Sequence, residues 1–235
     1  TALPDVYQMR ADVPLDILQS NTEFVTQQIL LQREQMFFDA ALAASVWDTQ
    51  PAGASSVNRG AHQVLYWDNA SATPIKDIRY YKSYVRKLTG FTPNALVITP
   101  DVADALFDCA EIIARMPTTE AQLADAAFLA KCFGLEEVTI ASGVIDTAVE
   151  GATATPGWYG TEKALLFYKP KSPGLMTPAA MYCYSVKQFD GDYMGARTRV
   201  YRDEPRESQI VEGNLYCDFK AVGADLGVYF SGLMT

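Results

Sequence analysis

Histidine is almost absent from this 235-residue chain, in which His62 is the single example. A serine or cysteine nucleophile needs a general base, and histidine most often fills that role. There is no GxSxG sequence, and the segment GATATPG lacks the lysine and the glycine spacing of a phosphate-binding loop. We therefore interpret His62 as incidental and predict no catalytic and no cofactor-binding residue.

Cysteine pairs with metal-ligand spacing are also missing. The four cysteines, Cys109, Cys132, Cys183 and Cys217, form no CxxC motif. With one histidine in the chain, a structural zinc site is improbable, and we predict no metal site and no cofactor. Cysteine is among the residue types most often buried, so we expect four buried, reduced thiols, consistent with synthesis in a cytosol.

The chain lacks an apolar run of the ~20 residues that a membrane-spanning helix requires, so we expect no membrane partner. It opens with TALPDVYQMR, which is neither a signal peptide nor an initiator methionine, and we expect a processed or truncated form. The net charge is −9, with 19 basic and 28 acidic residues. This balance argues against nucleic-acid wrapping as the main task, and it adds a repulsion that self-assembly must overcome.

The strongest positive signal is a long helix predicted over residues 14–46, with Pro14 in its first turn. Ile17, Phe24 and Leu31 repeat every seven residues and are called the heptad row below. An adjoining second row completes one broad apolar stripe, formed by Leu18, Val25, Ile29, Met36 and Ala40. Thirty residues make a rod of about 45 Å, about the width of a compact sphere of this chain length, so we expect an elongated or flat subunit.

The remaining pattern indicates an α+β fold. Helices are predicted over residues 73–90, 99–116 and 119–133, opened by a Thr-Pro pair in the first two and closed by Gly90 and Gly134. Strands are predicted over 62–67, 95–99, 138–141, 164–168 and 179–186, with loops over 49–60 and 147–160. From Arg197 onward every segment resembles a strand, and Leu215, Cys217 and Phe219 alternate with polar neighbours as in a half-buried antiparallel sheet.

Two charged groups fall on predicted helices. Arg79, Lys82 and Arg86 line the outer face of the 73–90 helix among tyrosines, a pattern seen in nucleic-acid binding, but a solvated or subunit-facing surface fits an acidic chain better. Asp104 and Asp108, with Glu111, follow at i, i+4 and i+7. They fit a divalent-cation site, an acidic contact surface, or a solvated face on which Glu111 pairs with Arg115, and we favour the solvated face.

Two further groups are candidate subunit contacts. Arg197 and Arg199 belong to a set of arginines interspersed with acidic residues, which on an edge strand resists unwanted pairing and fixes register with a neighbour. Trp158 and Tyr159 lie in a glycine-bracketed loop. An exposed aromatic pair is a natural contact anchor, and the preferred alternative is that the two rings cap the core of their own domain.

A series of motifs follows in a fixed order along the chain. In the segment TPIKDIRYYKSYVRKLTGFTPNALV a helix ends in a TG-x-x-PN turn, here Thr89, Gly90, Pro93 and Asn94, before a buried strand. The segments LAKCFGLEEVTIASG, GWYGTEKALLFYKP and SPGLMTPAAMYCY come next. Over about residues 70–190, these motifs and their order resemble those of tailed-bacteriophage major capsid proteins with the Hong Kong 97-type fold.

The resemblance implies a peripheral domain over residues 1–94 with a spine helix at about 14–46, an axial domain over 95–189, and closing strands over 190–235. It implies a head protein, not an enzyme, that self-assembles as hexamers and pentamers into an icosahedral shell around double-stranded DNA. Scaffold, portal and decoration proteins would be further partners, with assembly in the bacterial host cytoplasm and a final place in the virion.

One departure from the family concerns the N-terminal arm and the extended hairpin, because only about a dozen residues precede Pro14. We therefore assign no cross-link residues. Two other functions stay open: an encapsulin-like compartment shell, which would enclose cargo enzymes, and a small cytosolic enzyme.

Overall fold

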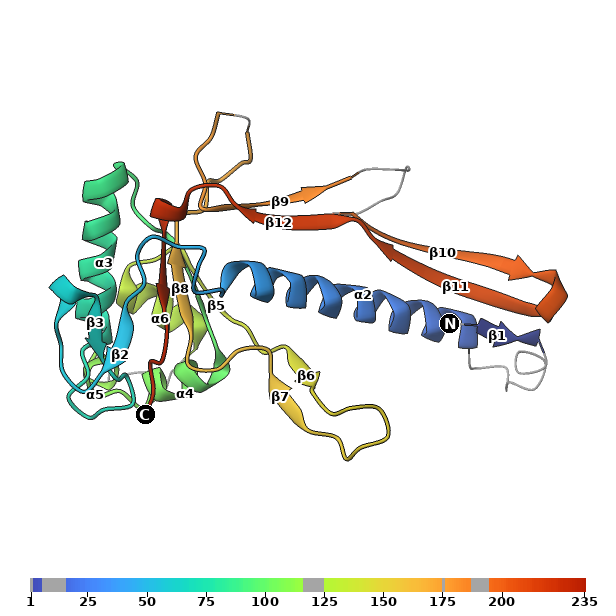
Figure 1. Ribbon diagram of the computed structural model, residues 1–235, viewed down its shortest axis with the longest axis horizontal. Helices are drawn as coiled ribbons and strands as arrows, with labels where there is room; N and C mark the ends of the chain where they lie inside the picture. The colour runs from blue at the N-terminus through green and yellow to red at the C-terminus, as the bar shows by residue number, and fades with distance from the viewer. Residues whose placement is uncertain (1, 6–15, 116–124, 175, 187–194) are drawn as a thin grey trace. The chain divides into compact units, whose positions relative to one another are not determined.

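A computed structural model describes residues 2–5, 16–115, 125–174, 176–186 and 195–235 (Figure 1). The chain divides into two compact units. The first unit contains Thr1–Phe37 and Cys183–Phe219, and the second contains Phe38–Tyr182 and Lys220–Thr235. The α+β class predicted from the sequence is confirmed. The division into peripheral, axial and closing segments concerns places in a shell and stays a prediction.

The first unit is built on a three-stranded antiparallel sheet in the order β1-β11-β10. These strands are β1 (Ala2–Pro4), β10 (Ala196–Asp203) and β11 (Ser208–Leu215), and β10–β11 is a hairpin closed by a 3-10 turn, η2 (Glu204–Arg206). Figure 1 shows helix α2 (Ile17–Ala41) running along this hairpin. The approach is close at Gly213, where an added Cβ would lie 2.3 Å from Ile29 Cδ1, so a larger residue there would require the Ile29 and Val25 side chains to shift.

Helix α2 divides the predicted apolar stripe in two. Ile29 of the second row is buried, and Val25 lies beside Gly213 of the sheet. In the heptad row, by contrast, Phe24 is 53% exposed and Leu31 38% exposed. The helix therefore packs Ile29 against its own chain and leaves Phe24 and Leu31 of the heptad row exposed.

The predicted end of this helix at Val46 is wrong, because α2 ends at Ala41. The buried Trp47 indole donates a hydrogen bond of 2.7 Å to the Ala41 carbonyl oxygen, replacing the backbone N–H that would continue the helix. Pro14, the predicted start, lies outside the described residues.

The second unit surrounds a four-stranded sheet in the order β13-β8-β4-β5. Strands β4 (Ala95–Ile98) and β5 (Glu137–Ile140) are parallel, whereas β8 (Ala164–Phe167) pairs antiparallel with both β4 and β13 (Gly227–Phe230). Every residue of β4 is buried, as expected for a central strand covered on both faces, and every residue of the edge strand β13 is buried as well. The core contains Trp67, Tyr81 and Phe230, whose rings lie 5.6 Å (Trp67–Phe230) and 5.3 Å (Tyr81–Phe230) apart.

Helix α3 (Pro74–Thr89) has the predicted bounds, with Gly90 in the left-handed conformation at its C-terminus. Ile75, Ile78 and Val85 form its buried side as expected. The assignment of Leu88 to that side is wrong, since Leu88 is 58% exposed.

The predicted 99–116 helix is interrupted. It consists of α4 (Pro100–Phe107) and α5 (Ala110–Ile113), because Cys109 is extended and its carbonyl oxygen accepts from the N–H of Ile112 and Ile113, which starts a new turn. Its predicted end at Met116-Pro117 lies outside the described residues. Helix α6 (Ala126–Phe133) begins after Asp125, whose carboxylate caps the Ala126 N–H, and it ends at Gly134 as predicted.

Short paired strands complete the structure. Strand β2 (Ala52–Ala54) runs parallel to β3 (Gln63–Leu65), β6 (Val144–Asp146) pairs with β7 (Pro156–Trp158), and β9 (Met181–Ser185) pairs with β12 (Cys217–Ala221). The loops predicted over 49–60 and 147–160 therefore each contain a strand. A 3-10 turn, η1 (Arg59–Ala61), precedes His62, and another, η3 (Ala224–Leu226), precedes β13. All four cysteines are free, but burial is wrong for Cys183, which is exposed, and incomplete for Cys132 and Cys217.

Candidate functional site

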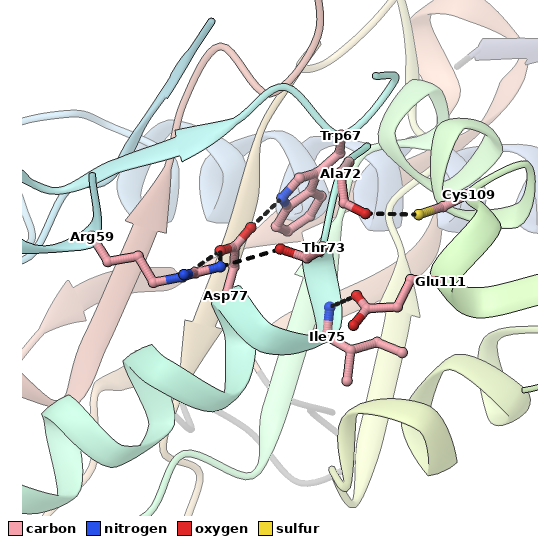
Figure 2. A network of polar contacts seen from close by, with 8 residues as sticks. All are labelled: Arg59, Trp67, Ala72, Thr73, Ile75, Asp77, Cys109 and Glu111. Carbon is pink, nitrogen blue, oxygen red and sulfur yellow. Dashed lines mark hydrogen bonds and ion pairs between the residues drawn. The ribbon is translucent and has the colours of Figure 1, made fainter. Parts of the chain in front are cut away.

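A buried polar network fixes the start of helix α3 in the second unit (Figure 2). Asp77 is fully buried, and its carboxylate lies 2.6 Å from the Arg59 guanidinium. The second carboxylate oxygen accepts from the Trp67 indole at 3.4 Å, while Arg59 also donates to the Thr73 hydroxyl. Burial raises the pKa of Asp77, and the charge of Arg59 partly offsets that effect. Thr73 thus holds Arg59, and its side chain does not cap α3.

The cap of α3 comes from Glu111 on helix α5. Its carboxylate accepts a hydrogen bond of 3.0 Å from the backbone N–H of Ile75, the second residue of α3 (Figure 2). The predicted pairing of Glu111 with Arg115 is therefore wrong, since no ion pair joins them within the described residues. The negative charge of the carboxylate also interacts favourably with the positive end of the α3 helix dipole.

The predicted basic face of α3 separates into two kinds of residue. Arg79 and Arg86 are exposed. Lys82 instead donates to the carbonyl oxygens of Phe133 (3.2 Å) and Gly134, at the C-terminus of α6, and burial lowers its pKa. Lys82 thus caps a neighbouring helix. Lys76 and Lys87, which were not predicted as site residues, are exposed beside the two arginines.

The predicted acidic row is also rearranged. Because the helix breaks at Cys109, Glu111 leaves the row and Asp104 and Asp108 remain, both exposed. They line an open cleft of about 550 Å³ together with Asp68 and Asp101. Asp68 accepts from Thr235, and Asp101 accepts from the N–H of Glu162 at 2.5 Å. Within the described residues, no group of three or more His, Cys, Asp or Glu side chains is arranged to hold a metal ion.

The predicted aromatic pair, Trp158 at the end of β7 and Tyr159 directly after it, is divided between surface and core. Trp158 is 44% exposed, whereas the Tyr159 ring stacks on the buried Phe38 with centroids 5.7 Å apart. Trp158 is thus available for an external contact, and Tyr159 packs inside its own unit.

Arg197 and Arg199 lie on β10, the outer strand of the first unit's sheet. Arg199 pairs with Glu212 on β11 at 2.6 Å and covers the Tyr201 ring at 5.0 Å. Arg197 lies opposite Asn214 in the register. Arg199 therefore contacts its own hairpin, and the assignment of Arg197 and Arg199 to a subunit contact stays a prediction.

The single histidine, His62, follows η1 with a φ of 54°, and its ring lies 5.7 Å from that of Tyr84. No helix among the described residues combines the length and apolar character needed to cross a bilayer.

Comparisons with solved structures identify the fold. A phage-related protein from Bordetella bronchiseptica matches with a TM-score of 0.77 at 17% identity, over 99% of this chain and 73% of that one. The SrpI encapsulin of Synechococcus elongatus matches with a TM-score of 0.60 at 13% identity, over 98% and 71%. The capsid of cyanophage P-SCSP1u gives 0.58 at 12% identity, over 98% and 70%.

At the sequence level, no protein-family model and no curated protein matches this chain. The structural matches nevertheless span almost all of it. The resemblance predicted from the ordered motifs is therefore confirmed at the level of the fold, and the chain adopts the fold of phage capsid proteins.

Proposed function

We propose that this chain is a major capsid protein of the Hong Kong 97 type, which self-assembles into an icosahedral shell around phage double-stranded DNA. The observation that carries this proposal is the capsid-type fold over nearly the whole chain, shared with a phage-related protein and a cyanophage capsid. In that shell, residues 1–94 with the spine helix would be peripheral, 95–189 axial, and 190–235 the closing strands.

The surface of helix α2 supports a self-associating function. Phe24 and Leu31 of the heptad row are exposed, and Leu30 is 49% exposed beside them. Apolar side chains that lie exposed to solvent in one contiguous patch mark sites of protein association. Obligate interfaces bury upward of roughly 2,000 Å², which several such surfaces per subunit would supply.

The same proposal assigns no catalysis to the chain. We infer hexamers and pentamers of identical subunits as its main assemblies, with scaffold, portal and decoration proteins as further partners. Assembly would take place in the bacterial host cytoplasm, and the protein would remain in the virion.

A compartment shell of the encapsulin type is the second candidate function. The TM-score of 0.60 to the SrpI encapsulin is close to the 0.58 of the cyanophage capsid, so the fold does not separate the two functions. The contents of the particle do separate them, because a phage head holds nuclease-protected DNA and a compartment holds cargo protein.

Sedimentation velocity and negative-stain microscopy of the expressed chain test the proposal across salt and pH. We expect capsomers or closed shells, and particles recovered from infected or induced cells should contain protected DNA. A chain that stays monomeric under every condition would contradict a shell function, and particles filled with protein would establish the encapsulin alternative.

A further inference from the structure

Four cations on helix α3 form one exposed surface of the second unit, which we name the α3 basic face. It comprises Lys76, Arg79, Arg86 and Lys87, with the 38%-exposed Tyr80 among them. At 100° per residue these positions lie within one side of the helix. None of the four cations has an ion-pair partner among the described residues, unlike Arg59, Arg199 and Arg202. Four positive charges that no described residue neutralises thus lie together on a protein whose net charge is −9.

This face is held rigidly. The Asp77–Arg59 ion pair fixes the first turn of α3, Glu111 caps the Ile75 N–H, and Gly90 ends the helix. Lys82, the cation nearest the buried side, is directed to the C-terminus of α6. The basic face is therefore preorganised, so binding through it would cost little conformational entropy.

A complementary acidic surface lies on the same unit. Asp104 and Asp108 are exposed at the C-terminal end of α4, beside Asp68 and Asp101 in the open cleft. Two electrostatic effects destabilise the charges of Asp104 and Asp108. Like charges four residues apart on a helix repel each other, and negative charge is repelled by the negative C-terminal end of the helix dipole. Neither carboxylate is neutralised by a cation of the described residues. A cation supplied by another molecule would remove both penalties.

Building on the capsid function proposed above, we propose that the α3 basic face binds the Asp104–Asp108 cleft of a second copy of this chain. The two surfaces share no residue, so each subunit can donate its helix to one neighbour and receive the helix of another. Such heterologous, head-to-tail contacts close into rings when the rotation between subunits returns to its start. Local charge complementarity would also guide association between molecules that otherwise repel.

Phosphates of packaged nucleic acid are the competing occupant of the basic face, because lysines and arginines around tyrosine suit that ligand as well. The second copy is favoured because the acidic complement is present on this same chain and lacks a cation of its own among the described residues. Nucleic acid would explain the basic helix and leave the two aspartates at the end of α4 unexplained.

A charge-swap experiment tests the contact. The variant R79E/R86E and the variant D104R/D108R should each raise the protein concentration needed for half-maximal assembly about tenfold or more, measured by light scattering and sedimentation. The chain with all four substitutions restores opposite charges across every contact and should assemble at nearly the wild-type concentration. K171E/K220E, which changes the net charge as R79E/R86E does but at two lysines elsewhere, should assemble normally.

Thermal melts of the unassembled chains verify that each variant folds. If the four-substitution chain assembles no better than its parents, or if R79E/R86E assembles normally, the contact is wrong while the shell function stands. Normal assembly of R79E/R86E with weaker retention of DNA would assign the basic face to nucleic acid and overturn the proposal. Failure of the wild-type chain to assemble would instead refute the shell function itself.

Discussion

The Glu111 carboxylate and the backbone N–H of Ile75 are joined by a hydrogen bond of 3.0 Å across 36 residues of sequence. One short helix, α5, thereby caps another, α3, and fixes the helix that carries the basic face. The contact is possible because α5 starts a new turn after Cys109, since a continuous helix would carry Glu111 in line with Asp104 and Asp108.

Glu111→Ala should lower stability by loss of this cap. Removing an N-terminal cap costs about 1 kcal/mol, which corresponds to a fall of about 2–4 °C in the melting temperature of a chain of this size. Glu150→Ala removes an exposed carboxylate from the β6–β7 loop and serves as the matched control, with an unchanged melt. Differential scanning calorimetry on both variants would contradict the capping function if the two melts moved equally.

Helix boundaries set by neighbouring residues were predictable from the sequence. The Thr73-Pro74 start and the Gly90 end located α3, and Gly134 located the end of α6, because proline and glycine act through their own backbone conformation. The early end of α2 was not predictable. It depends on the Trp47 indole reaching back to the Ala41 carbonyl oxygen, a contact that no propensity encodes.

The sequence indicated which residues form the candidate surfaces, but it did not indicate which residues they contact. Lys82 was grouped with Arg79 and Arg86 by helical spacing, yet its partners Phe133 and Gly134 lie 51 and 52 residues away. Long-range partners of this kind are set by tertiary packing. The division of the α2 stripe has the same origin, because Gly213 lets β11 approach Ile29 and leaves Phe24 uncovered.

The heptad row of α2 should matter for assembly and not for the stability of the single chain. Phe24→Gln with Leu31→Gln replaces two exposed apolar side chains by a good helix former, so the change in unfolding free energy should stay within about 0.5 kcal/mol. Assembly measured by sedimentation should fall sharply. Ile29→Ala, on the packed side of α2, should instead lower the unfolding free energy of the single chain by about 2–5 kcal/mol, because it leaves a cavity. Equal destabilisation by both changes would show that the heptad row is covered by its own chain.

Two aspartates should affect the pH dependence of stability with opposite signs. Burial raises the pKa of Asp77 above its ordinary value of 3.8. Its contribution to folding stability is therefore present at acid pH and lost as pH rises through the raised pKa. The backbone N–H groups of Ala148 and Thr155 lower the pKa of Asp146, so its contribution is present above the ordinary pKa and lost as pH falls through the lowered one.

Urea unfolding of Asp77→Asn and Asp146→Asn from about pH 3 to pH 6 measures both trends. The stability of the wild type relative to Asp77→Asn should decrease as pH rises over this range. Its stability relative to Asp146→Asn should increase. Parallel trends for the two variants would mean that the Arg59 charge, rather than burial, governs the titration of Asp77.

Trp158 and Tyr159 are adjacent in sequence but should respond differently to substitution. Trp158→Ala removes an exposed ring, so the melting temperature of the single chain should hardly change while assembly weakens, as expected for an aromatic contact anchor. Tyr159→Ala removes the ring stacked on Phe38, which is worth about 0.5–1.5 kcal/mol beyond the area that it buries. Its melt should therefore fall whether or not assembly is affected. Both variants are compared in thermal melts and in assembly. A lowered melting temperature for Trp158→Ala would assign that ring to the core. Normal assembly of the same variant would exclude the ring from the subunit interface.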